Sequence, residues 1–182
     1  MENEISQYLN LIMERLVGLL DSAPVSVKAI VTGAIGSAAH ASKEKFHPYF
    51  EATMTRLQPF LVLVNEGEEL DLRGIATDAI GTIAEAVGKE SFRPYFPQMM
   101  QNAFDGVALG NARLKECSFL FFGVMAKVFE DEFAPYLPMV VPALVASLKQ
   151  SEGGDDILNR LSQPRSFVFY SSDIDWLPIL FL

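Results

Sequence analysis

The sequence repeats one five-residue pattern three times: FHPYF at residues 46–50, FRPYF at residues 92–96 and FAPYL at residues 133–137. The copies begin 46 residues (92 − 46) and 41 residues (133 − 92) apart. A period of about 40–47 residues is typical of proteins built from stacked two-helix units. The pattern therefore predicts a helical-repeat fold.

A second pattern lies upstream of each copy, in which a basic residue precedes a glycine by eight positions. It runs from Lys28 to Gly36, from Arg73 to Gly81 and from Lys115 to Gly123. These glycines precede the phenylalanine of the next copy by 10, 11 and 10 residues. Two patterns that stay in register over three copies indicate true structural repeats.

Apolar residues recur at helical spacing on both sides of each copy, as amphipathic helices require. Proline is expected in the first turn of each helix that follows the motif, where its missing N–H costs nothing. Gly88 is expected to end the helix before it. The predicted helices cover residues 5–20, 25–41, 48–64, 72–87, 94–109, 112–129 and 135–149.

The fold class that follows is all-α: a right-handed HEAT- or armadillo-like α-α superhelix of about three and a half helix pairs. The repeats are expected to occupy residues 1–150, as units at about 5–41, 48–88 and 94–130 and a half unit at 135–150. Residues 151–182 lose the repeat register. We expect them to form an acidic linker and an irregular tail, either disordered or foreign to the repeat.

The chain is acidic, with a formal net charge of −9 at pH 7. An acidic protein repels the phosphate backbone, so direct nucleic-acid binding is not expected. A basic protein partner fits this charge better. The single cysteine fits a reducing compartment, and neither a signal peptide nor membrane insertion is expected.

Three carboxylates recur every seven residues on one predicted helix: Asp71, Asp78 and Glu85. Seven residues is close to two helical turns, so the three share one face. A pair of them acting as general acid and base is one interpretation, and a solvated stripe is the other. The repeat setting favours the stripe, which would complement a partner rich in lysine and arginine.

The basic residues of the second pattern, Lys28, Arg73 and Lys115, occupy equivalent positions in successive units. A ladder of ion pairs with acidic groups such as Asp71 or Glu116 is the favoured role, and contact with a partner is the alternative. Together with the carboxylates, they form the candidate partner-binding residues.

Catalytic and cofactor sites are not expected. His40 and His47 lie without a nearby cysteine, so they lack the ligand set that zinc needs. Residues 32–36 contain two glycines but lack the lysine of a phosphate-binding loop. Cys117 has no histidine close to it in sequence and is expected to be a core or groove thiol.

Residues 72–81 (LRGIATDAIG) with residues 92–100 (FRPYFPQMM) resemble the HEAT repeats of the importin-β (karyopherin-β) family. The similarity covers roughly residues 5–152 and is strongest to the middle repeats of receptors that carry histones and ribosomal proteins. The resemblance implies receptors several times longer than this chain. It also implies that second helices line a concave face that binds cargo and the GTPase Ran, while nucleoporins bind between convex helices.

The expected function is therefore a protein-binding segment of a nuclear import receptor. It would carry basic cargo through nuclear pores under Ran control and move between cytoplasm and nucleus. The alternative is a HEAT-repeat scaffold or regulatory subunit with the same fold and no part in transport.

Overall fold

A computed structural model describes the backbone of residues 2–150 and the side chains of residues 7–147. Every element within this part of the chain is helical, and none of its residues is in a β-strand. The all-α prediction is confirmed. The elements are α1 (Glu2–Ser22), α2 (Val25–Ser42), η1 (Lys43–Phe46), α3 (His47–Leu57), η2 (Gln58–Val62), α4 (Glu68–Phe92), α5 (Phe96–Ala108), α6 (Ala112–Phe129), η3 (Glu130–Tyr136) and α7 (Leu137–Gln150).

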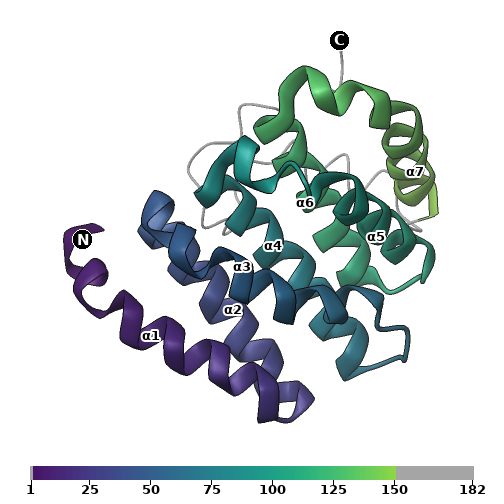
Figure 1. Ribbon diagram of the computed structural model, residues 1–182. Coiled ribbons are helices and arrows are strands. Elements are labelled where there is room, and N and C mark those ends of the chain that lie inside the picture. Colours follow the sequence, from purple (N-terminus) through teal and green to yellow (C-terminus); the bar gives the residue numbers. More distant parts are fainter. Residues whose placement is uncertain (1, 151–182) are drawn as a thin grey trace, which may run out of the picture. The chain divides into compact units, whose positions relative to one another are not determined.

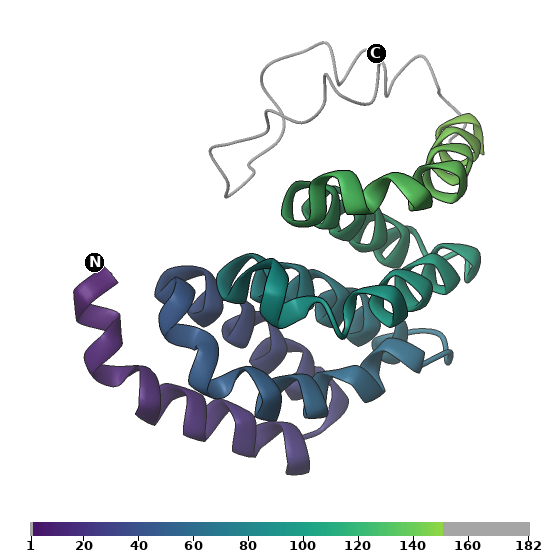
Figure 2. The same cartoon turned by 45° about the horizontal axis from the view of Figure 1, so that its top comes forward.

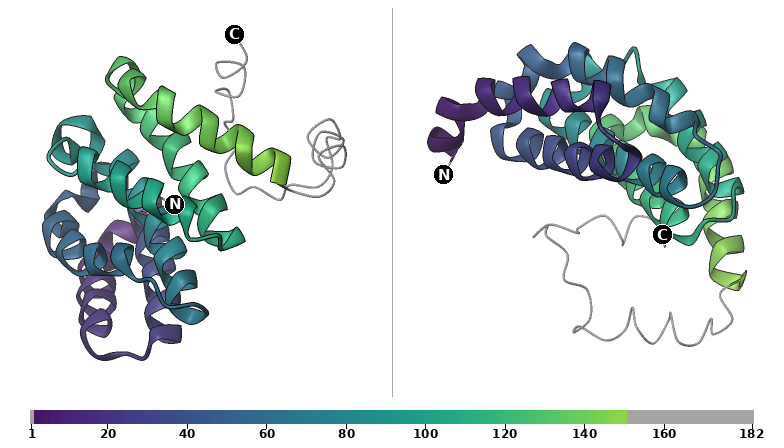
Figure 3. Two further views of the ribbon diagram at one scale, coloured as in Figure 1. Left: turned by 90° about the vertical axis from the view of Figure 1, so that its right-hand side faces the viewer. Right: turned by 90° about the horizontal axis from the view of Figure 1, so that it is seen from below.

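The chain divides after Phe133 into two blocks, and the first contains α1 to α6. Within it the helices form two layers (Figure 1). Helices α2, α4 and α6 pack side by side in the even-numbered layer. Helices α1 and α3 pack together in the odd-numbered layer, and α5 continues it against η2. Figures 2 and 3 show the same layers from other directions.

The second block contributes α7, a 14-residue helix with Pro142 inside it. The tail predicted for residues 151–182 lies outside the described residues.

Each Phe-x-Pro-Tyr motif lies where the second helix of one pair gives way to the first helix of the next, as expected. Its phenylalanine is the buried anchor of that turn. Phe46 and Phe92 are both 0% exposed, and Phe133 is 5% exposed. Burial of a side chain of this size contributes on the order of 1.5–3 kcal/mol, so the motif fixes the turn by packing.

Equivalent residues with a positive φ end α2 and α6 and interrupt α4. These residues are Lys43 (φ 49°), Gly88 (φ 79°) and Glu130 (φ 50°). Each lies seven positions after the glycine of the second pattern. A residue with positive φ breaks the helical hydrogen-bond ladder and redirects the chain. Gly88 therefore interrupts α4 before Phe92, as the sequence predicted.

Glycines bring the even-numbered helices close together. A Cβ atom at Gly36 would lie 3.3 Å from Ala79 Cα on α4, and one at Gly81 would lie 3.3 Å from Phe121 on α6. A side chain at these positions would push the neighbouring helix away. The expected role of small residues in close helix packing is confirmed.

Several predicted helix bounds differ from the observed ones, including the starts of α4 at Glu68 and of α7 at Leu137, and two differences have a clear cause. Residues 48–64 were expected to form one helix, but α3 ends at Leu57 and η2 follows to Val62. Pro59 explains the change, because proline lacks the N–H donor and disfavours a continued α-helix. The helix expected at Pro94 begins at Phe96 instead, with Pro97 in its first turn.

Candidate partner-binding site

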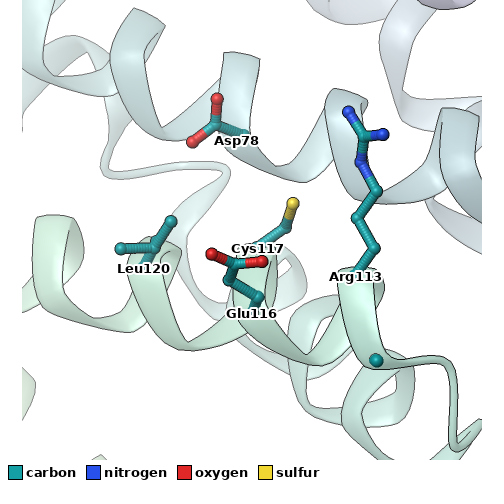
Figure 4. Close-up of a pocket in the computed structure, with 6 residues that line it drawn as sticks. Asp78, Arg113, Glu116, Cys117 and Leu120 are labelled. Atoms are coloured by element: carbon teal, nitrogen blue, oxygen red, sulfur yellow. The ribbon is translucent and has the colours of Figure 1, made fainter. Parts of the chain in front are cut away.

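The even-numbered layer contains an open pocket of about 520 Å³ between α4 and α6. Asp78 lines the pocket from α4, and the other lining residues all belong to α6. Figure 4 shows Arg113 extending from the start of α6 toward α4. The lining residues of this α4–α6 pocket are Asp78, Ala112, Arg113, Glu116, Cys117 and Leu120.

Close packing of the two helices places the pocket where it is. Gly74 on α4 has no side chain, so Cys117 Sγ approaches to 3.4 Å from the position that a Cβ atom would take there. At the start of α6, Asn111 caps the helix by accepting a hydrogen bond from the backbone N–H of Leu114 at 2.9 Å. Arg113 and Glu116 therefore lie in the first turns of α6, beside Asp78.

The electrostatics of the pocket centre on Asp78. Partial burial raises the pKa of its carboxyl group, Arg113 opposes the shift, and Glu116 adds to it. Burial also raises the pKa of the Cys117 thiol to about 11, and the charge of Asp78 adds to that shift. A thiol with this pKa is protonated at neutral pH and is a poor nucleophile.

The predicted carboxylate stripe divides into three environments along α4. Asp78 lines the α4–α6 pocket, where it keeps contact with solvent although the neighbouring helices partly desolvate its carboxyl group. Glu85 forms an ion pair with Lys127 of α6, with Oε1 and Nζ 3.1 Å apart. Asp71 lies in the first turn of α4, where a negative charge is favoured by the helix dipole. Two of the three carboxylates thus interact with cations on α6.

The three predicted basic residues also differ from one another. Lys28 Nζ lies 5.8 Å from the centroid of the Phe60 ring, at cation–π distance. Lys115 is half-buried on α6. Arg73 is 4% exposed and faces the protein interior.

Arg73 bonds to backbone carbonyls in place of the carboxylates expected for an ion-pair ladder. It donates to the carbonyl of Leu63, at the end of η2, and to that of Asn102 in α5, both at 2.9 Å. Burial lowers the pKa of its guanidinium, and Asp105 partly offsets this. Since an arginine stays charged even so, Arg73 links three elements from within.

Sequence reasoning did not select Arg113, and it considered Glu116 only as a partner for a basic ladder. Both residues become part of a site because α4 and α6 pack together, which no local pattern reveals. The spacing of Arg113 and Glu116, one helical turn apart at the start of a predicted helix, was the available signal.

The described residues hold no group of three or more histidine, cysteine or acidic side chains that could bind a metal ion. None of the described helices is long and apolar enough to span a membrane. His47 caps a turn: its Nδ1 lies 2.9 Å from the Glu44 carbonyl and its Nε2 lies 3.1 Å from Ser91 Oγ.

Comparison with known proteins identifies the family. The family model "Importin subunit beta-1-like, TPR repeats" matches residues 1–113. The chain is also 46% identical over 164 residues to "Probable importin subunit beta-4" of Schizosaccharomyces pombe, a match that covers 90% of the chain. The chain belongs to the importin-β family.

Other importin-β relatives match more distantly. "Importin subunit beta-3" of Saccharomyces cerevisiae is 27% identical over 81% of the chain. Among solved structures, that of Kap121p bound to Pho4p has a TM-score of 0.72 and 25% identity over 90% of the chain. Kap121p bound to Nup53p has a TM-score of 0.70. These neighbours confirm the predicted solenoid class.

This importin-β chain spans only a small share of its relatives. It corresponds to 15% of the fission yeast protein and to 16% of Kap121p.

Proposed function

We propose that this chain is a cargo-binding segment of a nuclear import receptor, working in the cytoplasm and the nucleus. The observation that carries the proposal is the 46% identity to a fission yeast importin subunit over 90% of the chain. The structural neighbour Kap121p, which has been crystallised with Pho4p and with Nup53p, supports it. Cargo release by Ran and passage along nucleoporins belong to the same proposal for the whole receptor.

The chemistry of the α4–α6 pocket favours a basic cargo. Asp78 and Glu116 place two carboxylates around a lining that includes the apolar side chain of Leu120. A lysine or arginine of the cargo can lay its methylene stem on Leu120 while its cationic head meets the carboxylates. Because burial disfavours the charge of Asp78, an added cation in the pocket is favoured in return.

Arg113 sets the strength of this site. Its charge already offsets part of the cost of ionised Asp78. A cargo cation therefore competes with Arg113, which limits the affinity of a single pocket. Several basic side chains bound along a longer receptor would then be needed for tight binding.

Fluorescence anisotropy with the 182-residue chain and a labelled peptide rich in lysine and arginine tests the proposal. We expect the double variant Asp78→Asn, Glu116→Gln to weaken binding by about 3- to 10-fold, the range of one or two exposed charge pairs. Glu14→Gln with Glu44→Gln is the matched control, because these exposed carboxylates lie outside the pocket.

Equal losses in both double variants, or no binding by the natural chain, would contradict a basic-cargo site. The proposed release of cargo by Ran is tested on the longer receptor. Ran with bound GTP should release the peptide, whereas Ran with bound GDP should not. A scaffold without a transport role would respond to neither form.

A further inference from the structure

The α4–α6 pocket holds three charged side chains, Asp78, Glu116 and Arg113, that do not pair with one another. None of the three forms an ion pair with a residue that the structure describes. Seven residues further along α4, by contrast, Glu85 meets Lys127 of α6 at 3.1 Å. The same two helices can therefore bring opposite charges together, yet they leave the charges of the pocket unpaired.

Arg113 lacks the acceptors that hold three other arginines. Arg56, Arg73 and Arg93 each donate hydrogen bonds to carboxylate or carbonyl oxygens. Arg113 donates none to a described residue, although Glu116 lies three positions further along the same helix, at a spacing that permits a pair. Arg113 also lies in the first turn of α6, where the helix dipole disfavours a cation. Its guanidinium is thus available to an acceptor from outside the chain.

The charges of the pocket are separated in space. In Figure 4, Asp78, Glu116 and Leu120 lie on one side of Cys117, and the guanidinium of Arg113 lies on the other. The two carboxylates and Leu120 form an anionic half of the pocket, and Arg113 forms a cationic half. Three residues along an α-helix correspond to a rise of about 4.5 Å, which sets the scale of the separation between the halves.

A purely basic ligand satisfies only the anionic half. Its cation can bind Asp78 and Glu116, but its body then removes water from Arg113 without supplying an acceptor. A charged group that loses water and gains no partner is costly. If Arg113 turns to the same two carboxylates, it competes with the ligand for them. A ligand that carries a carboxylate beside its cation avoids both costs.

We propose that the pocket selects a cargo segment of mixed charge. A lysine or arginine of this segment binds Asp78 and Glu116, and an aspartate or glutamate two positions away binds Arg113. Alternate side chains of an extended peptide point to the same face and lie about 6–7 Å apart, a distance that flexible side chains adapt to the pocket. The inference rests on the proposed function and refines it, because it makes Arg113 a determinant of specificity.

Two isomeric peptides test the arrangement of charge. Both are rich in lysine and carry one glutamate, so their composition and net charge are the same. In the paired peptide the glutamate follows a lysine by two positions, and in the separated peptide it follows a spacer of glycine and serine. We expect the 182-residue chain to bind the paired peptide about 2- to 5-fold more tightly in fluorescence anisotropy, the range of one exposed charge pair.

Variants then locate the preference. Arg113→Gln should abolish it and should bind the separated peptide at least as tightly as the natural chain does, because a competitor of the cargo cation is gone. Arg113→Lys keeps the charge and should keep most of the preference. Arg15→Gln is the matched control, because Arg15 is an exposed arginine of α1 outside the pocket. It removes the same charge and should leave the preference intact.

Equal binding of the two isomers by the natural chain would overturn the inference and leave a basic-cargo site in place. The same holds if Arg113→Gln retains the preference, or if it loses both peptides alike, since Arg113 would then support the pocket without selecting its ligand. Failure of the natural chain to bind either peptide would contradict the proposed function, and the inference would fall with it.

Discussion

At the scale of single residues, the end of each second helix depends on a backbone conformation that few side chains tolerate. Lys43, Gly88 and Glu130 share it, and only one of them is glycine. Left-handed and related conformations cost a residue with a side chain about 1–3 kcal/mol. The chain thus carries strain at two of three equivalent turns and avoids it at the third.

Gly88→Ala is expected to destabilise the protein by about 1–3 kcal/mol. Space is not the reason, because a Cβ atom at Gly88 meets no atom within 4 Å; the cost comes from the backbone alone. Glu130→Gly should stabilise by up to about 1 kcal/mol, since relief of strain exceeds the added entropy of the unfolded chain. Urea denaturation of both variants measures the difference, and shifts of the same sign would contradict it.

Asp78→Asn should stabilise the chain at neutral pH while weakening a basic ligand. The pKa of this carboxyl is raised above its ordinary value of 3.8, so the folded state holds the proton to a higher pH than the unfolded state does. Folding is therefore penalised at neutral pH, and the penalty disappears as pH falls below 3.8.

We expect the variant to raise Tm by about 1–2 °C at pH 7, a small effect because solvent screens the site. The gain should vanish on acidification. Thermal unfolding followed by circular dichroism between pH 3.5 and 8 provides the comparison, with Glu14→Gln as a matched substitution at an exposed position outside the pocket. A gain that persists at pH 3.5 would exclude a charge-based cause.

At the scale of elements, the even-numbered layer depends on helix pairs that approach through glycine. Gly36→Ala should destabilise by about 1–3 kcal/mol, because its new Cβ atom would lie 3.3 Å from the Ala79 backbone. Gly18→Ala should instead stabilise by about 0.5–1 kcal/mol, since Gly18 lies in α1 with no atom within 4 Å of a Cβ.

Both substitutions add one methyl group to a helix, so helix propensity is matched and only packing differs. Guanidinium denaturation gives the two free energies of unfolding. A stabilising Gly36→Ala would show that α2 and α4 can separate at no cost.

The sequence predicted helix bounds well where the apolar periodicity agrees with the capping and helix-breaking residues. The helix predicted for residues 112–129 matches α6 at both ends, because Asn111 caps one end and the repeat register places the other. The prediction failed at Pro59, where an apolar period continued through a residue that α-helix tolerates poorly. The prediction followed the helical spacing of the apolar residues and gave too little weight to Pro59.

The sequence predicted the part of the candidate site that lies on a single helix, but not the contacts between helices. A seven-residue spacing correctly placed Asp78 and Glu85 toward a common side of α4. Their partners Arg113 and Lys127 lie on α6 and meet them through packing between helices. The burial of Arg73 had no local signal either, because its acceptors lie 10 and 29 residues away in sequence.

At the scale of the whole molecule, the net charge of −9 at pH 7 dominates encounters with a charged partner. Attraction of a polycation over a distance is screened with a Debye length of about 10 Å at 0.1 M salt. We therefore expect the association rate of a peptide rich in lysine to fall by about 10-fold between about 50 and 300 mM NaCl. The dissociation rate should change less.

Stopped-flow fluorescence measures both rates. A peptide of the same length with its lysines replaced by glutamine is the control, and its association should be slow and insensitive to salt. An association rate that is independent of salt for the basic peptide would rule out steering by the acidic chain.

The hydrogen bonds between successive pairs also bear on how the protein is made. Tyr49 reaches back 39 residues to Asn10, and Tyr95 reaches back 44 residues to Glu51. Each pair thus needs only the pair already synthesised before it, and loops of this size close at a small entropic cost. Folding can therefore proceed on the ribosome from the N-terminus, one pair at a time, with each docked pair serving as the template for the next.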